Sequence, residues 1–164
     1  MDGVYETFEV EHSDSRGVFY ETFKNPEDID FKYFCSVTSK PKVIRGLHYR
    51  LTKQVKFLHV LWGEIFDVVL DMRKDSDTFG KYETRFMTPG IGLLIPFGVA
   101  HGYQVISRNV GAKVEYYFSD YYRPEHERIV LYNDPYLEIP WPLKSGLVSD
   151  KDRDGLLFVN SEYL

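Results

Sequence analysis

The sequence of 164 residues is poor in several features that mark particular classes of protein. It contains a single cysteine, Cys35, so no disulfide can form within the chain, and this usage is typical of a reducing cytoplasm. No apolar run approaches the roughly 18 residues of a membrane span, and the acidic N-terminal segment does not resemble a signal peptide. We therefore expect a soluble protein located in the cytoplasm.

Basic residues are also too few and too dispersed for a nucleic-acid-binding surface. Lys and Arg total 20 against 25 Asp and Glu, which gives a net charge of −5, whereas nucleic-acid binding needs clustered positive charge. An anionic substrate would have to be held by a few placed arginines. The motifs C-x-x-C, G-x-G-x-x-G and G-x-S-x-G are absent, so nothing indicates thiol redox chemistry, a dinucleotide or a serine nucleophile.

The sequence is rich in aromatic residues, which make up 16% of the chain, and in short segments in which apolar and polar residues alternate. Apolar and polar residues alternate in about ten strand-length segments separated by turn residues, and no amphipathic helix stands out. The candidate strands are 4–10, 18–23, 32–39, 43–50, 56–62, 64–71, 81–88, 92–98, 103–108 and 112–122. This pattern predicts an all-β sandwich, jelly roll or barrel with room for one ligand in its mouth.

No linker, repeat or low-complexity segment divides the chain, so we expect residues 1–164 to form a single domain. The segment from about Pro124 onward is rich in proline. We predict that this tail is irregular and wraps around the barrel.

The segment KVIRGLHYR (42–50) carries more polar groups than a buried strand can use. Histidine is the side chain best suited to act as a general base near neutral pH, so His48 is a candidate base, and such a base usually needs a carboxylate behind it. Gly46 indicates a bulge or a close backbone approach, which would let Arg45 and His48 face one cleft despite their odd spacing. Arg50 receives no role from the sequence.

The segment GLLIPFGVAHGY (92–103) has the spacing of the second cupin motif, whose histidine, here His101, points into the barrel. Many cupins bind a metal through that histidine, a glutamate and an H-x-H pair. Here the residue two after His48 is an arginine, and strand alternation sends His59 to the face opposite Lys56. A metal-free site is favoured, and a metal-dependent cupin enzyme stays as the alternative.

The remaining candidates suit proton transfer beside a ketone. Such chemistry needs a base on one face of the substrate, an acid on the other and a cation at the oxygen. Lys56 can stabilise an enolate, and Tyr116 can donate or accept a proton. Alternation within 115–122 puts Tyr116 and Tyr122 on one face, although cross-strand packing explains such tyrosines equally well.

Together these motifs resemble the dTDP-4-dehydrorhamnose 3,5-epimerases, a family with a cupin-type jelly-roll barrel. The resemblance implies inversion of C3, C5 or both in a nucleotide-linked 4-keto-6-deoxy sugar. It also implies a homodimer that exchanges an N-terminal strand, with no metal or organic cofactor. The segments that carry it are DSRGVFYETF (14–23), VIRGLHYR (43–50), 54–82, LLIPFGVAHGY (93–103), YYFSDYYRPEHER (116–128), NDPYLEIPWP (133–142) and LVSDKD (147–152).

The resemblance implies specific roles. His48 matches the base that removes the proton beside the C4 ketone, and Asp152 matches the carboxylate that orients it. Lys56 matches the lysine at the enolate oxygen, and Tyr116 matches the tyrosine that returns a proton from the opposite face. The implied substrate-binding residues are Arg16 and Arg45 near the diphosphate, Glu21 near the base, and His101 and Tyr122 in the pocket.

Some substrate-facing positions depart from the family pattern. The stretch 33–37 replaces a common Q-D-N, and Tyr117 replaces the lysine that usually follows the catalytic tyrosine. These changes put the nucleotide and the sugar in question more than the reaction. A 3,4-ketoisomerase of the same fold stays as an alternative, but it has no far-face acid and Tyr116 argues against it. A catalytically silent sugar-binding module would have no use for the proposed proton-transfer residues.

Overall fold

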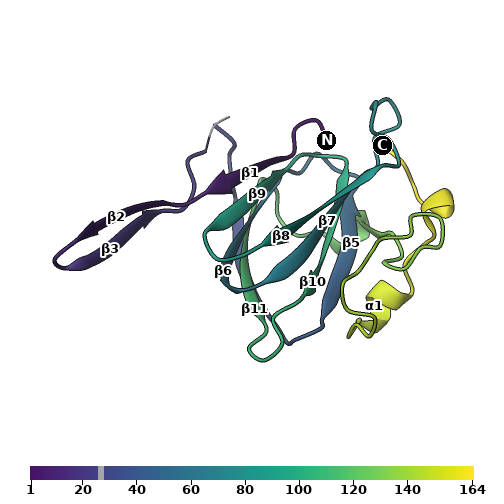
Figure 1. The fold of residues 1–164 in the computed structure, drawn as a ribbon. Coiled ribbons are helices and arrows are strands. Elements are labelled where there is room, and N and C mark those ends of the chain that lie inside the picture. Colours follow the sequence, from purple (N-terminus) through teal and green to yellow (C-terminus); the bar gives the residue numbers. More distant parts are fainter. Residues whose placement is uncertain (26–27) are drawn as a thin grey trace.

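The computed structural model describes residues 1–25 and 28–164 and is built mainly of antiparallel strands (Figure 1). The strands are β1 (Tyr5–Phe8), β2 (Val10–Asp14), β3 (Gly17–Glu21), β4 (Tyr33–Ser39), β5 (Ile44–Arg50), β6 (Lys56–Gly63), β7 (Ile65–Asp71), β8 (Tyr82–Met87), β9 (Ile91–Ile95), β10 (Val99–Val105), β11 (Ala112–Phe118) and β12 (Glu127–Ile129). One sheet has the order β1-β9-β6-β11-β4 and the other β12-β5-β10-β7-β8, while β2 pairs with β3. The all-β prediction is confirmed.

Most predicted strands are present, with their ends moved by a few residues. The strand predicted at 103–108 instead runs from Val99 to Val105, because the small apolar residues before His101 are buried and pair with β7. The strand predicted at 112–122 ends at Phe118. Strands β2 and β12 were not predicted, since β2 is exposed throughout and β12 has only three residues.

The C-terminal segment forms a second apolar layer outside the barrel. Strand β7 is buried at every position, because one face lines the barrel and the other lies under this segment. Apart from β12, the segment contains only a helical turn, α1 (Asp150–Arg153), and the short 3-10 turns η1 (Pro124–His126) and η2 (Phe158–Asn160). The predicted irregular tail is therefore confirmed. No helix in the described ranges is long and apolar enough to span a membrane.

Strands β2 and β3 form a hairpin that projects away from the barrel (Figure 1). Every residue of β2 is exposed. In β3 the residues Val18, Phe19 and Tyr20 are 50%, 64% and 46% exposed. Exposed apolar side chains and free strand edges of this kind are typical of a surface that a partner covers.

Strands β5 and β10 approach each other closely at Gly46. Its φ is +112°, and a Cβ added there would lie 2.6 Å from both the Gly102 Cα and the His101 carbonyl oxygen. The pairing of the two strands is irregular between His101 and Tyr103, and His48 lies opposite His101. The predicted close approach is confirmed, and it brings two histidines together.

Replacing Gly46 tests how far the site depends on this contact. We expect Gly46→Ala to lower the free energy of unfolding by about 2–4 kcal/mol, because it combines backbone strain with a steric clash. Urea denaturation measures the loss. Gly17→Ala is the matched control, since Gly17 has φ +140° but no atom lies within 4 Å of an added Cβ. Equal losses in the two variants would contradict an effect of strand packing.

Candidate active site

A cavity of about 270 Å³ opens between the two sheets. Its walls differ in chemistry, because the sheets contribute different inward-facing side chains. The sheet containing β5 and β10 supplies most of the charged and titratable groups: Arg45, His48, Arg50, His101 and Glu127. The sheet containing β4 and β11 supplies mainly aromatic and apolar groups: Tyr33, Cys35, Val37, Tyr116 and Phe118. Lys56 of β6 also lines the cavity.

His48 is backed by a carboxylate from a distant part of the chain. Its Nε2 lies 2.5 Å from the Asp152 Oδ1. Asp152 is buried in α1, where its backbone N–H donates to the Ser149 hydroxyl at 3.1 Å. Burial raises the pKa of the Asp152 carboxyl, but its hydrogen bonds, chiefly with His48, bring that pKa below its ordinary value. An ionised Asp152 accepts the Nε2 proton, which leaves His48 Nδ1 as the nitrogen able to act as a base.

Lys56 lies beside His48, with its Nζ 3.5 Å from the His48 carbonyl oxygen. Burial lowers the pKa of the Lys56 ammonium to about 8, with Glu127 opposing this shift and Arg50 adding to it. Below that pH the side chain is mainly protonated. Lys56 can therefore place a positive charge at an oxygen in the cavity at neutral pH, but it is close to losing that charge.

Tyr116 comes from the wall opposite His48, on β11. Its ring centroid lies 6.1 Å from that of His101. Burial raises the pKa of the Tyr116 hydroxyl well above 10. The hydroxyl is therefore kept in its protonated form, as a hydrogen-bond and proton donor within the cavity.

His101 has its own carboxylate partner, which makes a second His–Asp pair in the same cavity. Its Nε2 lies 2.6 Å from the Oδ2 of Asp67, a residue on β7. Burial lowers the pKa of His101, although Asp67 acts to raise it. Sequence reasoning gave Asp67 no role. The available signal was the run FDVVLD, in which Asp67 shares the inward phase of its apolar neighbours Ile65 and Val69.

Further charged groups surround the mouth of the cavity. The Arg50 guanidinium lies over the Tyr122 ring, 5.2 Å from its centroid. Glu127 accepts a hydrogen bond from the Tyr122 hydroxyl at 3.3 Å and pairs with Lys151. Arg45 donates from Nε to the Ser39 hydroxyl at 2.9 Å. Glu127 and Arg50 were missed as site residues, although Glu127 follows Tyr122 closely in the segment RPEHER.

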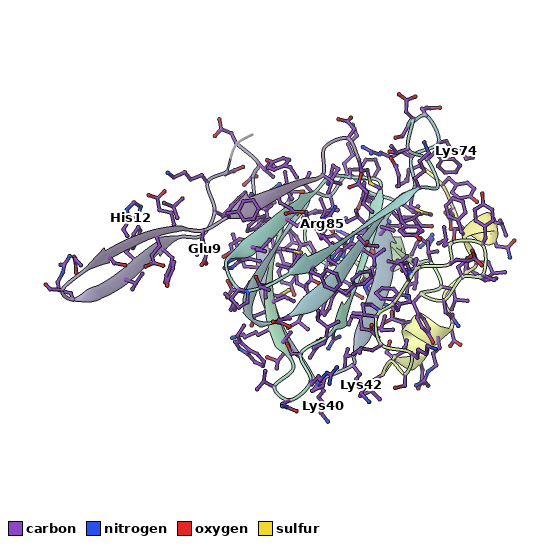
Figure 2. The ribbon with its side chains drawn as sticks, in the orientation of Figure 1. Glu9, His12, Lys40, Lys42, Lys74 and Arg85 are labelled. Atoms are coloured by element: carbon purple, nitrogen blue, oxygen red, sulfur yellow. The ribbon has the colours of Figure 1, made fainter. Side chains whose placement is uncertain are left out.

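Two predicted substrate-binding residues lie outside this cavity. Arg16 is at the tip of the β2–β3 hairpin, where its side chain is 88% exposed and pairs with Asp14 at 2.6 Å. Glu21 ends β3 and bonds His12 at 3.0 Å. Figure 2 shows His12 on the hairpin, away from the barrel. The structure thus brings the other predicted residues together but separates Arg16 and Glu21 from them, and the roles of both stay predictions.

His59 lies on the face opposite Lys56, as predicted, and this face is outside the barrel. Its Nε2 lies 2.9 Å from Glu9, a residue near the base of the hairpin (Figure 2). The inward positions of β6 are taken by Lys56, Leu58 and Val60. His59 is therefore separated by the sheet from the cavity that holds His48 and His101.

Comparison with known proteins gives consistent matches along the chain. The family model described as dTDP-4-dehydrorhamnose 3,5-epimerase matches residues 1–160. The Neisseria gonorrhoeae protein of that name is 39% identical over 160 residues, which cover 92% of this chain and 48% of the relative, so the chain spans about half of that protein. The Pseudomonas aeruginosa protein of that name is 36% identical, covering 91% of this chain and 87% of the relative.

A solved structure shares the fold as a whole. The dTDP-6-deoxy-D-glucose-3,5-epimerase from Legionella pneumophila, in complex with dTDP-4-keto-L-rhamnose, matches with a TM-score of 0.90 and 34% identity. The match covers 99% of this chain and 91% of the other. The described strands therefore form the cupin-type jelly roll that the family resemblance implied.

The shifted pKa of Lys56 can be measured directly. After reductive ¹³C-methylation, the NMR signal that Lys56→Gln removes should titrate with a midpoint of about 8. Glu127→Gln should lower this midpoint, because it removes a negative charge, and Arg50→Gln should raise it, because it removes a positive one. A midpoint near the ordinary 10.5 would contradict the burial of the ammonium.

Proposed function

The chain belongs to the dTDP-4-dehydrorhamnose 3,5-epimerase family, and from this premise we propose that it inverts the carbons next to the ketone of a nucleotide-linked 4-keto-6-deoxy sugar. The substrate we propose is dTDP-4-dehydro-6-deoxyglucose, and the product is dTDP-4-dehydrorhamnose. One observation carries the proposal. A carboxylate-backed His48 and a buried Tyr116 face each other across one cavity, with Lys56 beside them.

The first step removes a proton from the sugar. His48 Nδ1 takes the proton from the carbon next to C4, the electron pair of that C–H bond forms a double bond to C4, and the carbonyl π electrons move onto the C4 oxygen to give an enolate. Asp152 stabilises the imidazolium that results, since its carboxylate accepts the Nε2 hydrogen bond. The Lys56 ammonium stabilises the charge that develops on the oxygen.

The second step returns a proton from the other side. Tyr116 lies on the wall opposite His48, and burial keeps its hydroxyl protonated by raising its pKa. Its proton goes to the same carbon from the far face, the C4 ketone re-forms, and the configuration is inverted. His48 then releases its proton and Tyr116 regains one, so the enzyme is unchanged.

The same groups can serve both C3 and C5, because both carbons flank the C4 ketone and both of their protons are acidified by it. The oxidation state of the sugar does not change, and each proton removed is replaced. The reaction therefore requires no redox partner and no electron sink beyond the ketone itself. We accordingly propose no metal or organic cofactor.

The substrate's diphosphate requires cations near the cavity. Arg45 lines the cavity, and we propose that it contacts the diphosphate. Arg16 is too far along the hairpin to be part of the same lining, yet it is highly exposed. We propose a homodimer in which each hairpin crosses to the other copy and places Arg16 and Glu21 at that copy's cavity. Burial of the hairpin's apolar residues would stabilise the dimer.

Isotope exchange tests the proton-transfer roles. In D₂O the wild type should introduce deuterium at C3 and C5 of the sugar, located by NMR. His48→Ala should slow this exchange by about a hundredfold or more, because the base is removed. Tyr116→Phe should slow completed inversion more than loss of the proton, because only the returning acid is removed.

Matched variants and a substrate panel sharpen this test. Asp152→Asn should reduce exchange strongly, whereas Asp150→Asn, in the same helical turn but exposed, should not. Normal exchange in His48→Ala would refute the assigned base. Deuterium at C3 alone would indicate a single-centre epimerase, and conversion to a 3-keto isomer would indicate the ketoisomerase. Dependence on added metal after chelation would favour the metal-dependent alternative.

Subunit complementation tests the crossing of the hairpin. We expect Arg16→Ala and His48→Ala each to be impaired as homodimers. A mixed dimer of the two, isolated with two affinity tags, should recover about half of the wild-type activity, because one cavity then has both His48 and a partner's intact hairpin. If the mixed dimer recovered no activity, Arg16 would belong to the site of its own subunit. If light scattering showed a monomer, exchange of the hairpin would be excluded.

A further inference from the structure

Arg85 of β8 is connected to the active-site cavity through one buried carboxylate. In the register of β7 and β8, Arg85 lies directly opposite Asp67. Its Nη1 donates to the Asp67 Oδ1 at 3.1 Å, and the other oxygen of that carboxylate lies 2.6 Å from His101 Nε2. A single carboxylate thus lies between an arginine outside the cavity lining and a histidine within it.

Arg85 is itself held from both sheets. Its Nε lies 3.2 Å from the Glu6 Oε1 on β1, and its Nη2 donates to the Glu83 Oε2 at 3.1 Å. The side chain is only 12% exposed. These contacts fix the guanidinium at the edge where β1 of one sheet meets β8 of the other, so its orientation toward Asp67 is well defined.

The buried carboxylate of Asp67 needs the positive charge of Arg85 to compensate its own negative charge. Its side chain is 0% exposed and lies between Ile65 and Val69 of the apolar core. A carboxylate in such surroundings takes up a proton unless a positive charge compensates it. The Arg85 guanidinium supplies that positive charge by donating to Oδ1, so Asp67 acts as a hydrogen-bond acceptor toward His101 as well. His101 must then carry its proton on Nε2, and its Nδ1 is left as an acceptor.

We propose that Arg85 is a positioning residue, which holds His101 in the Nε2–H tautomer through Asp67, so that Nδ1 accepts a hydrogen bond from a hydroxyl of the substrate. This role rests on the proposed function, because it needs a hydroxyl-bearing ligand in the cavity. Burial also lowers the pKa of His101, which favours the neutral ring that the role requires.

Without Arg85, the donor and acceptor nitrogens of His101 would be exchanged, while the shape of the side chain would stay the same. A protonated Asp67 would donate to Nε2, and the ring would then carry its hydrogen on Nδ1. A donor would stand where the substrate hydroxyl needs an acceptor. The other ionisable groups whose charges act on His101 or Asp67 are Lys56 on β6, His48 on β5, and Tyr116 on β11.

Imidazole ¹⁵N NMR of the ligand-free protein tests the tautomer directly. The His101 signals, identified by their loss in His101→Asn, should show Nε2–H in the wild type and in Arg85→Lys. In Arg85→Gln they should show Nδ1–H, because a buried carboxyl without its cation holds a proton and donates it to Nε2. Glu83→Gln is the matched control, since it removes a neighbour of Arg85 but leaves the Asp67 contact.

Kinetics supply the second measurement. With the nucleotide-sugar substrate at neutral pH, Arg85→Gln should lower kcat/KM by about tenfold or more, while Arg85→Lys should stay near the wild type. An Nδ1–H tautomer in the wild type would overturn the proposal even if Arg85→Gln failed to fold. So would an unchanged tautomer in Arg85→Gln, or equal losses in the Gln and Lys variants.

The tautomer measurement and the test of the proposed function can fail independently of each other. The tautomer is read without substrate, so a protein that showed the expected tautomers but did not epimerise any nucleotide sugar would refute the proposed function and not the link from Arg85 to His101. An active epimerase with the wrong tautomers would do the reverse.

Discussion

The hydrogen bond between His48 and Asp152 sets the placement of the C-terminal segment, because its two residues are 104 positions apart. Asp152 can reach the histidine only if the segment packs against the outer face of β5, β10 and β7. The apolar layer formed by Leu137, Ile139 and Phe158 provides that packing. Strand β5 is therefore supported on both sides, and the proposed base is fixed by packing as well as by its carboxylate.

Burial shifts the pKa values of Lys56 and Tyr116 in opposite directions. We place both groups at the substrate, together with His48. A buried ammonium loses its proton more easily, whereas a buried phenol holds its proton more tightly, because in each case the uncharged form is favoured. The same low-polarity cavity thus lowers the pKa of Lys56 to about 8 and raises that of Tyr116 well above 10. One group remains a cation at neutral pH but is easily discharged, and the other remains a donor. A single environment prepares both roles.

The sequence pattern predicted what depends on local alternation. Strand period two put Lys56 and His59 on opposite faces and Tyr116 on one face with Tyr122, and the structure shows that Lys56 and Tyr116 face the cavity. Partners from other strands could not be found in this way, because the register that sets Asp67 opposite Arg85 is a property of the folded sheet. Asp152 came from family resemblance alone, since no local pattern links it to residue 48. Strand β2 was missed because its five residues include only one strongly apolar side chain.

Charge also explains why the proposed dimer would suit this chain. With a net charge of −5, the protein as a whole repels an anionic nucleotide sugar. Attraction must come from cations at the cavity, and there the acidic Glu127 offsets part of the charge of Arg45 and Arg50. A hairpin from a second copy would bring the Arg16 guanidinium to the mouth, and because Asp14 and Glu21 come with it, the gain is a placed hydrogen-bond donor for the phosphates rather than net positive charge. The apolar side chains of the same hairpin would lose their exposure in that step, so one docking event would both complete the binding site and stabilise the assembly.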